Sequence, residues 1–134
     1  MKEKILVVAG KRKRAIAKAK IKEGEGKITI NKIPYENLQE LKRLYIQEIV
    51  ELCKEVMPFN FDIEVRVRGG GVESQIEASR LAIAKALVAF TKNEKLKRVF
   101  LNYDRNLLIA DVRRKEPYKP GDSKARRKRQ KSYR

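Results

Sequence analysis

Among the residues of this 134-residue chain that could bind or react with a partner, most are basic. The chain holds 34 Lys and Arg residues against 17 Asp and Glu, which gives a formal net charge of +17. Unpaired charges are too costly to bury, so most of this excess must face water or an anionic partner. The chemistry that it predicts is neutralisation of phosphate, on nucleic acid first and on an anionic membrane second.

The densest group of cations lies in residues 112–134, where 11 Lys and Arg residues stand against 2 acidic ones. Val112 is the one sizeable aliphatic residue of this tail, so the tail cannot offset its ordering entropy and should be disordered alone. Tyr118 and Tyr133 offer surfaces on which bases can stack. A localisation signal and a membrane tether are the alternatives. Stable membrane binding also needs a lipidation motif or an amphipathic face near the tail, and the sequence shows neither. The tail cations are Arg113, Arg114, Lys115, Lys119, Lys124, Arg126, Arg127, Lys128, Arg129, Lys131 and Arg134.

A second basic group follows the first apolar run of the chain. The predicted loop holds Lys11, Arg12, Lys13 and Arg14, and lysines then recur at every second position from Lys18 to Lys22. A strand would place these lysines on one face, as a stripe that could bind nucleic acid. The alternative is a solvated edge strand that its lysines protect from pairing with other chains.

Three consecutive glycines, Gly69 to Gly71, separate a predicted strand ending in Arg66 and Arg68 from a predicted helix. Glycines at such a junction let backbone amides approach a phosphate, but they also serve a tight turn with positive φ. No P-loop follows them. Glu73 in the first helical turn would repel a phosphate, so a nucleotide pocket is not expected.

Several classes of protein are excluded by composition. The chain has no His, which removes His-dependent catalysis and His-ligated zinc. Its single Cys53 lies in an apolar helical stripe and is predicted to be a small core residue of a protein in a reducing compartment. Asp62 and Glu64 share one strand face without a partner for acid–base work or metal binding. We therefore expect no enzyme, metal, cofactor or small-molecule substrate, and the run from Ile5 to Ala9 is too short for a membrane span.

The elements that would position these residues follow from the hydrophobic period. Alternation over 15–22 favours a strand, although Ala and Lys also suit a helix, and the EGEGK turn suggests a hairpin with 27–31. An amphipathic helix follows, with a stripe of Leu38, Leu41, Tyr45, Ile49, Leu52 and Val56, and Pro58 ends it. We expect strands at 5–9, 15–22, 27–31, 59–67 and 107–110, and helices at 38–56, 72–91 and 94–102. This order predicts an α+β fold, a two-layer sandwich at 1–111, followed by the tail at 112–134.

One segment carries a specific resemblance. Residues 69–87, GGGVESQIEASRLAIAKAL, closely resemble the signature of the small-subunit ribosomal protein nine family. The opening VVAGKRKRAIAKAKI and the DVRR segment extend this resemblance along the whole chain, and the ending KARRKRQKSYR is similar to the archaeal and eukaryotic branch. The signature positions are Gly69, Gly70, Gly71, Ser74, Gln75, Ala78, Ala82, Ala84, Lys85, Ala86 and Leu87.

The resemblance implies a fold and a set of partners. The fold would be that of the second domain of ribosomal protein S five, with a left-handed βαβ crossover that is otherwise rare. The partners would be ribosomal RNA (rRNA) of the small-subunit head, neighbouring head proteins, and the anticodon stem-loop of peptidyl-site tRNA, in the cytoplasm and away from membranes. For rRNA it implies Lys11, Arg12, Lys13, Arg14, Lys18, Arg66, Arg68, Gly69, Gly70, Gly71 and the tail from Arg113 to Arg129; for tRNA it implies Lys131, Ser132, Tyr133 and Arg134.

Two other classes of function are compatible with a basic chain. The first is an enzyme of the same fold family, such as a small-molecule kinase or the protein subunit of ribonuclease P. A kinase of that fold should show a Gly-Ser-rich phosphate loop and a second domain, and this sequence shows neither. The second is a free nucleic-acid chaperone with a basic tail, which co-sedimentation with small subunits would distinguish from a ribosomal component.

Overall fold

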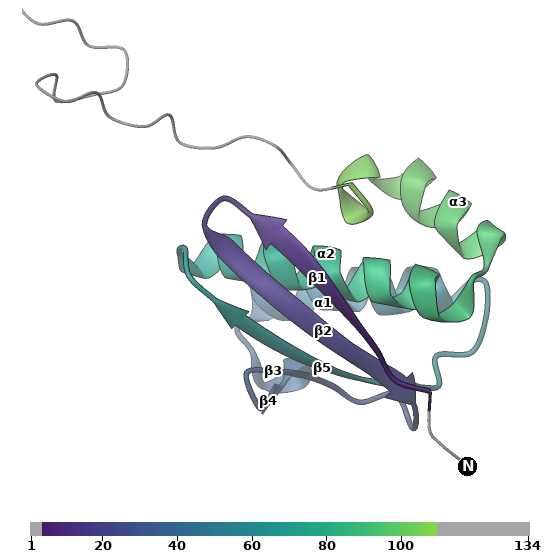
Figure 1. The fold of residues 1–134 in the computed structure, drawn as a ribbon, viewed down its shortest axis with the longest axis horizontal. Coiled ribbons are helices and arrows are strands. Elements are labelled where there is room, and N and C mark those ends of the chain that lie inside the picture. The colour runs from purple at the N-terminus through teal and green to yellow at the C-terminus, as the bar shows by residue number, and fades with distance from the viewer. Residues whose placement is uncertain (1–3, 110–134) are drawn as a thin grey trace, which may run out of the picture.

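The structure is a computed structural model of the chain, and it describes residues 4–109. Within these residues the chain forms a single sheet with three α-helices (Figure 1). The strands are β1 (Leu6–Arg12), β2 (Ala15–Glu23), β3 (Ile28–Ile30), β4 (Ile33–Pro34) and β5 (Phe61–Arg68). The helices are α1 (Glu40–Lys54), α2 (Val72–Thr91) and α3 (Glu94–Tyr103), with short 3₁₀ turns η1 (Tyr35–Asn37) and η2 (Arg105–Leu107).

The sheet has the strand order β1-β2-β5-β3-β4. Only β3 and β5 run parallel, and their connection contains α1, so a βαβ unit is embedded in an otherwise antiparallel sheet. In Figure 1, α1 and α2 lie behind the strands and α3 lies beside the sheet at the upper right, which leaves the front of the sheet free of helices. This mixed two-layer architecture confirms the predicted α+β class, and the hand of the crossover stays a prediction.

The alternating pattern of β2 explains how the sheet is oriented. Ala15, Ala17, Ala19 and Ile21 are completely buried, whereas the residues between them are exposed. Since successive side chains of a strand point to opposite faces, one side of β2 packs on α2 and the other remains in water. The strand predicted from this alternation is therefore confirmed.

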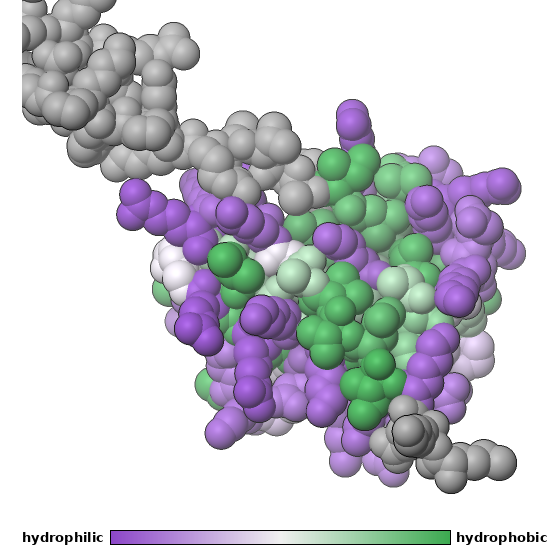
Figure 2. All heavy atoms as spheres, in the orientation of Figure 1, coloured by the Kyte–Doolittle hydropathy of each residue, from purple (hydrophilic) through white to green (hydrophobic). Residues whose placement is uncertain are grey.

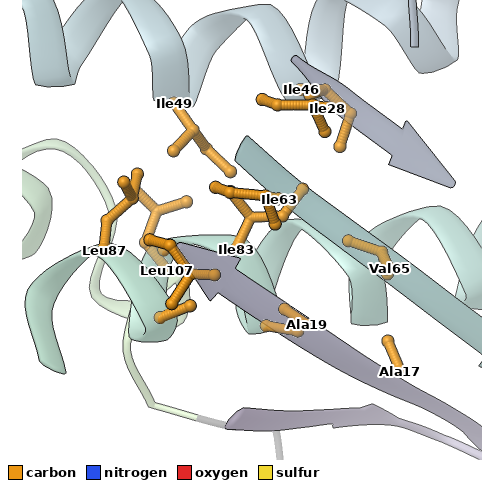
Figure 3. Close-up of a cluster of buried hydrophobic side chains, with 14 of the residues drawn as sticks. Ala17, Ala19, Ile28, Ile46, Ile49, Ile63, Val65, Ile83, Leu87 and Leu107 are labelled. Carbon is orange, nitrogen blue, oxygen red and sulfur yellow. The ribbon is translucent and has the colours of Figure 1, made fainter. Parts of the chain in front are cut away.

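The core lies between the sheet and the helices (Figure 3). Ile46 and Ile49 of α1 point toward Ile28 of β3 and Ile63 of β5, and Leu87 of α2 completes the apolar layer. Cys53 is completely buried in the same core, so its prediction as a core residue is confirmed. Burial raises the pKa of the Cys53 thiol to about 11, and the thiol therefore stays protonated at neutral pH.

The predicted hairpin between 15–22 and 27–31 is wrong, because β5 lies between β2 and β3. The segment joining β2 to β3 crosses the start of β5 instead of closing a hairpin. There, Asp62 Oδ1 accepts hydrogen bonds from the backbone N–H groups of Glu25, Gly26 and Lys27 at 3.0, 3.2 and 3.1 Å. These bonds, led by that of Lys27, lower the pKa of the Asp62 carboxyl, and they hold the segment against β5.

The predicted core stripe of the first helix is wrong in part. The side of α1 that packs inward carries Ile46, Ile49, Val50 and Cys53. Tyr45 and Leu41, both assigned to the stripe, are exposed, and Leu41 retains 75% of its accessible surface. The sequence of this helix has apolar residues on more than one side, and the sheet and α2 cover only one of them.

The turn between β1 and β2 and the segment after α3 differ from the prediction. Lys11 and Arg12 continue β1, since they pair with Ile16 and Ala15, so the turn is shorter than the predicted loop. The strand predicted at 107–110 is absent over 107–109, because backbone N–H groups there donate to carbonyls three and four residues earlier and close η2 and a turn. Leu107 is nevertheless buried, which explains why the sequence has an apolar residue at this position. Residue 110 lies outside the described residues.

Candidate nucleic-acid interface

The side of β1, β2 and β5 that no helix covers is the candidate interface, and we call it the open sheet face. Figure 2 views this side and shows hydrophilic side chains bordering an apolar area over β1. The exposed apolar residues there include Ile5, Val7 and Ile16. The face thus offers both cations for phosphates and apolar surface for sugars or bases.

Strand register brings cations of distant sequence together on the open sheet face. Lys18 of β2 lies directly opposite Arg66 of β5, and Ile16 lies between Lys11 of β1 and Arg68 of β5. Neighbouring residues on adjacent strands are about 5 Å apart, so these cations form one continuous patch. We call the end of the face formed by Lys11, Lys13, Arg14, Lys18, Arg66 and Arg68 the basic corner; all six residues are exposed.

Arg12 is separated from the other predicted rRNA ligands. Its side chain turns to the helical side of β1, where only 15% of it remains exposed. Its Nε lies 2.6 Å from Glu77 Oε2 of α2. Removing one partner of a shielded ion pair leaves the other charge poorly solvated, so Arg12 acts chiefly in holding β1 on α2.

Gly69 and Gly70 are required by the fold of the turn. Their φ angles are 80° and 65°, a left-handed region that other residues rarely adopt. A Cβ on Gly69 would lie 2.6 Å from the carbonyl oxygen of Arg14, and one on Gly70 would lie 2.9 Å from the backbone nitrogen of Ala15. The two glycines therefore pack the start of α2 against the β1–β2 turn, whatever else they contact.

Gly71 differs from its two neighbours. A Cβ at this position would meet nothing within 4 Å, and its φ of −89° suits any residue. It is the N-cap of α2, and no side chain accepts a hydrogen bond from the first N–H groups of the helix. Those groups and the positive end of the helix dipole face the end of the molecule that carries Arg14 and Arg68, although Glu73 reduces the local potential.

Gly71→Val should therefore separate the two explanations of the glycine run. We expect the free energy of unfolding to fall by about 1 kcal/mol at most, because valine is a poorer N-cap than glycine but the position is open and extended. If RNA approaches the backbone here, the new side chain should weaken RNA binding by about tenfold, about 1.4 kcal/mol. Titration of labelled small-subunit rRNA with each variant measures this. Gly70→Val is the control that should unfold the turn, and unchanged affinity of Gly71→Val would leave the glycines with a structural role alone.

A shallow hollow of about 170 Å³ lies farther along the open sheet face. Lys20, Lys22 and Lys27 line it together with Thr29, Glu64 and Asp62. Lys27 and Thr29 were not expected at the interface, since only the pairing of β3 with β5 brings them to the edge of the open sheet face. Their alternating exposed positions were the available signal, but it does not specify a neighbour.

The remaining predicted site residues lie outside the described residues. These are the rRNA ligands Arg113, Arg114, Lys115, Lys119, Lys124, Arg126, Arg127, Lys128 and Arg129, and the tRNA ligands Lys131, Ser132, Tyr133 and Arg134. Within 4–109 no group of three His, Cys, Asp or Glu residues could hold a metal ion. No helix in that same range is long and apolar enough to span a membrane.

The fold and the basic corner define a small, strongly basic α+β protein with a helix-free cationic sheet face. The family model described as ribosomal protein S9/S16 matches residues 10–134, and the chain belongs to this family. The family resemblance seen in the sequence is thereby confirmed, and this is a family of structural proteins and not of enzymes.

Curated relatives agree over nearly the full length. The chain is 50% identical over 135 residues to small ribosomal subunit protein uS9 of Methanococcus maripaludis strain C7, covering 98% of this chain and 99% of the relative. The protein of the same name from Methanococcus vannielii is 47% identical, with the same coverage.

Proposed function

We propose that the chain is a structural constituent of the small ribosomal subunit, in the cytoplasm, where it binds rRNA through the basic corner and the tail. The observation that carries the proposal is the register of β1, β2 and β5, which gathers Lys18, Arg66 and Arg68 on a sheet face that no helix covers. Membership of the S9/S16 family and the names of the relatives support the ribosomal setting.

The division of labour follows from charge. Residues 1–111 form the body, which presents the basic corner, and residues 112–134 form the tail, with 11 cations and 2 acidic residues. The two parts together neutralise phosphates over a longer stretch of rRNA than the body could reach alone. Neighbouring proteins of the subunit head complete the set of partners that we propose.

Removing residues 112–134 should flatten the salt dependence of rRNA binding. Each lost phosphate contact should make the slope of log K against log salt shallower by about 0.9 on duplex RNA, or by about 0.7 on single strands. Filter binding at several salt concentrations, with the full chain and the truncated chain, measures this slope. An unchanged slope would contradict the tail as an RNA ligand, while the contribution of the basic corner would remain testable by itself.

We further propose that the tip of the tail, Lys131 to Arg134, contacts the anticodon stem-loop of peptidyl-site tRNA. An arginine can hold a phosphate with two parallel hydrogen bonds, and Tyr133 beside Arg134 can stack or donate a hydrogen bond. The tip is also the part of the tail farthest along the chain from the body, so it can reach beyond the rRNA that the body contacts.

Deleting residues 132–134 should leave assembly of the subunit nearly intact, because Arg126 to Arg129 remain to bind rRNA. It should weaken retention of peptidyl-site tRNA by about 1–3 kcal/mol if one charge-assisted contact is lost. The measurement is the dissociation rate of tRNA from subunits that carry the full or the shortened chain. Equal rates on correctly assembled subunits would exclude a role for the tip in tRNA binding.

A further inference from the structure

The outward side of α1 is an apolar surface that nothing in the described part of the chain covers. Leu41, Leu44 and Tyr45 retain 75%, 45% and 40% of their accessible surface. At about 100° per residue these three side chains lie on one side of the helix, together with Glu48 and Glu51. We call these five residues the outer α1 face, and α1 lies behind the sheet when the open sheet face is viewed from the front (Figure 1).

Contacts with two other helices hold this surface in place. Arg80 of α2 lies 3.0 Å from Glu48 and 3.5 Å from Asp104 at the end of α3, with its guanidinium carbon 5.8 Å from the ring centre of Tyr45. The hydroxyl of Tyr103 in α3 also interacts with the carboxylate of Glu48. The charge of Glu48 raises the pKa of that hydroxyl. A surface fixed at three helices is preorganised, so a partner need not order it on binding.

The charge of this surface is opposite to that of the rest of the protein. Residues 36–55 contain 5 Glu residues against 3 Lys and Arg residues, in a chain whose net charge is +17. The helical period puts Glu48 and Glu51 on the outward side and Lys42 and Arg43 on the others. An apolar patch among carboxylates repels RNA phosphate, and it suits a partner that brings both cations and an apolar side chain.

We propose that the outer α1 face is a docking surface for a basic segment of a neighbouring protein, with an apolar side chain seated between Leu41 and Tyr45. The inference rests on the proposed function, since it places the partner in the small-subunit head. RNA binds on the open sheet face, and protein binds on the opposite side of the body. A second copy of this chain is disfavoured, because pairing two outer α1 faces would bring Glu48 and Glu51 against their own counterparts.

Site-specific photo-crosslinking in purified small subunits tests the assignment. A photoreactive phenylalanine analogue replaces Leu41 in one version of the full chain and Lys18 in another; both positions are exposed, so neither change should disturb folding. The expected adduct from position 41 resists ribonuclease and maps to a Lys- and Arg-rich peptide of another subunit protein. The expected adduct from position 18 is with rRNA.

The outcomes separate the two proposals. If position 18 does not crosslink to rRNA, the proposed function of the open sheet face fails. If position 18 crosslinks to rRNA while position 41 crosslinks to rRNA, to a second copy, to an acidic peptide or to nothing, the docking surface is overturned.

A charge variant supplies an independent test on the same subunits. Glu51→Lys, added to the chain with the probe at position 41, should lower the yield of the protein adduct several-fold. Glu94→Lys, which makes the same charge change at an exposed residue of α3, is the matched control and should leave the yield unchanged. Equal yields from the two variants would overturn the electrostatic basis of the proposal.

Discussion

Gly10→Val is expected to cost the body about 3 kcal/mol of its free energy of unfolding, a large part of the roughly 5–15 kcal/mol that a domain has. A Cβ on Gly10 would lie 2.6 Å from the carbonyl oxygen of Ala78 and 2.6 Å from the backbone nitrogen of Ala82. Both atoms belong to the backbone of α2, which cannot move aside as a flexible side chain would. Chemical denaturation of the full chain, followed by circular dichroism, measures the loss.

Ala9→Val is the matched control for Gly10→Val. Ala9 precedes Gly10 on β1 but lies on the open sheet face, where it is exposed and opposite Lys18. A β-branched side chain suits a strand, so the control should stay within about 0.5 kcal/mol of the original chain. A Gly10→Val variant as stable as this control would contradict the close packing of β1 on α2.

Reversing three charges of the basic corner is expected to abolish most of the affinity of the body for rRNA. In a chain with Lys18→Glu, Arg66→Glu and Arg68→Glu, three phosphate contacts are replaced by repulsion. We expect at least about a hundredfold loss of affinity. The slope of log K against log salt should also become shallower by about 2 to 3. All three side chains are exposed, so the fold should be retained.

The control for this triple variant changes net charge equally at another place. Lys95→Glu, Lys97→Glu and Arg98→Glu alter three exposed residues of α3, which lies in the helical layer. If bulk charge alone drove binding, both triple variants would lose affinity to the same degree. Binding by the open sheet face instead requires a much larger loss from the variant of the basic corner.

The cations of the candidate interface could be recognised in the sequence, but their arrangement could not. Lys18, Arg66 and Arg68 were correctly placed on exposed sides of strands, because alternation over 15–22 and 59–67 is a local property. Their proximity depends on β5 pairing with β2, and the sequence suggested β3 as the neighbour of β2 instead. Arg12 was predicted among the RNA ligands because a run of four cations resembles a loop, whereas β1 extends as far as Arg12 and turns its side chain toward Glu77.

For helix α1, the sequence predicts the helix itself but not which of its sides is buried. Its period and its end before Pro58 were predicted from residues close together in the sequence. Which of its apolar sides is buried depends on Ile28, Ile63 and α2, which contact the helix only in the folded chain. The wrong choice of stripe also concealed the outer α1 face, because residues assigned to the core are not examined as a surface.

Composition and local period established the class of this protein: a basic tail, alternating strands, three helices and a glycine run with a family signature. Those features depend on interactions within a few residues, whose geometry each backbone state dictates. The tertiary structure alone decided the strand order, the requirement for glycine at Gly10, and the separation of a cationic sheet face from an acidic helical face. These features depend on contacts between residues far apart in the chain. A strand with one apolar side can bury that side equally well beside any of several neighbouring strands. Only the simultaneous packing of β5, α1 and α2 makes one arrangement the most stable.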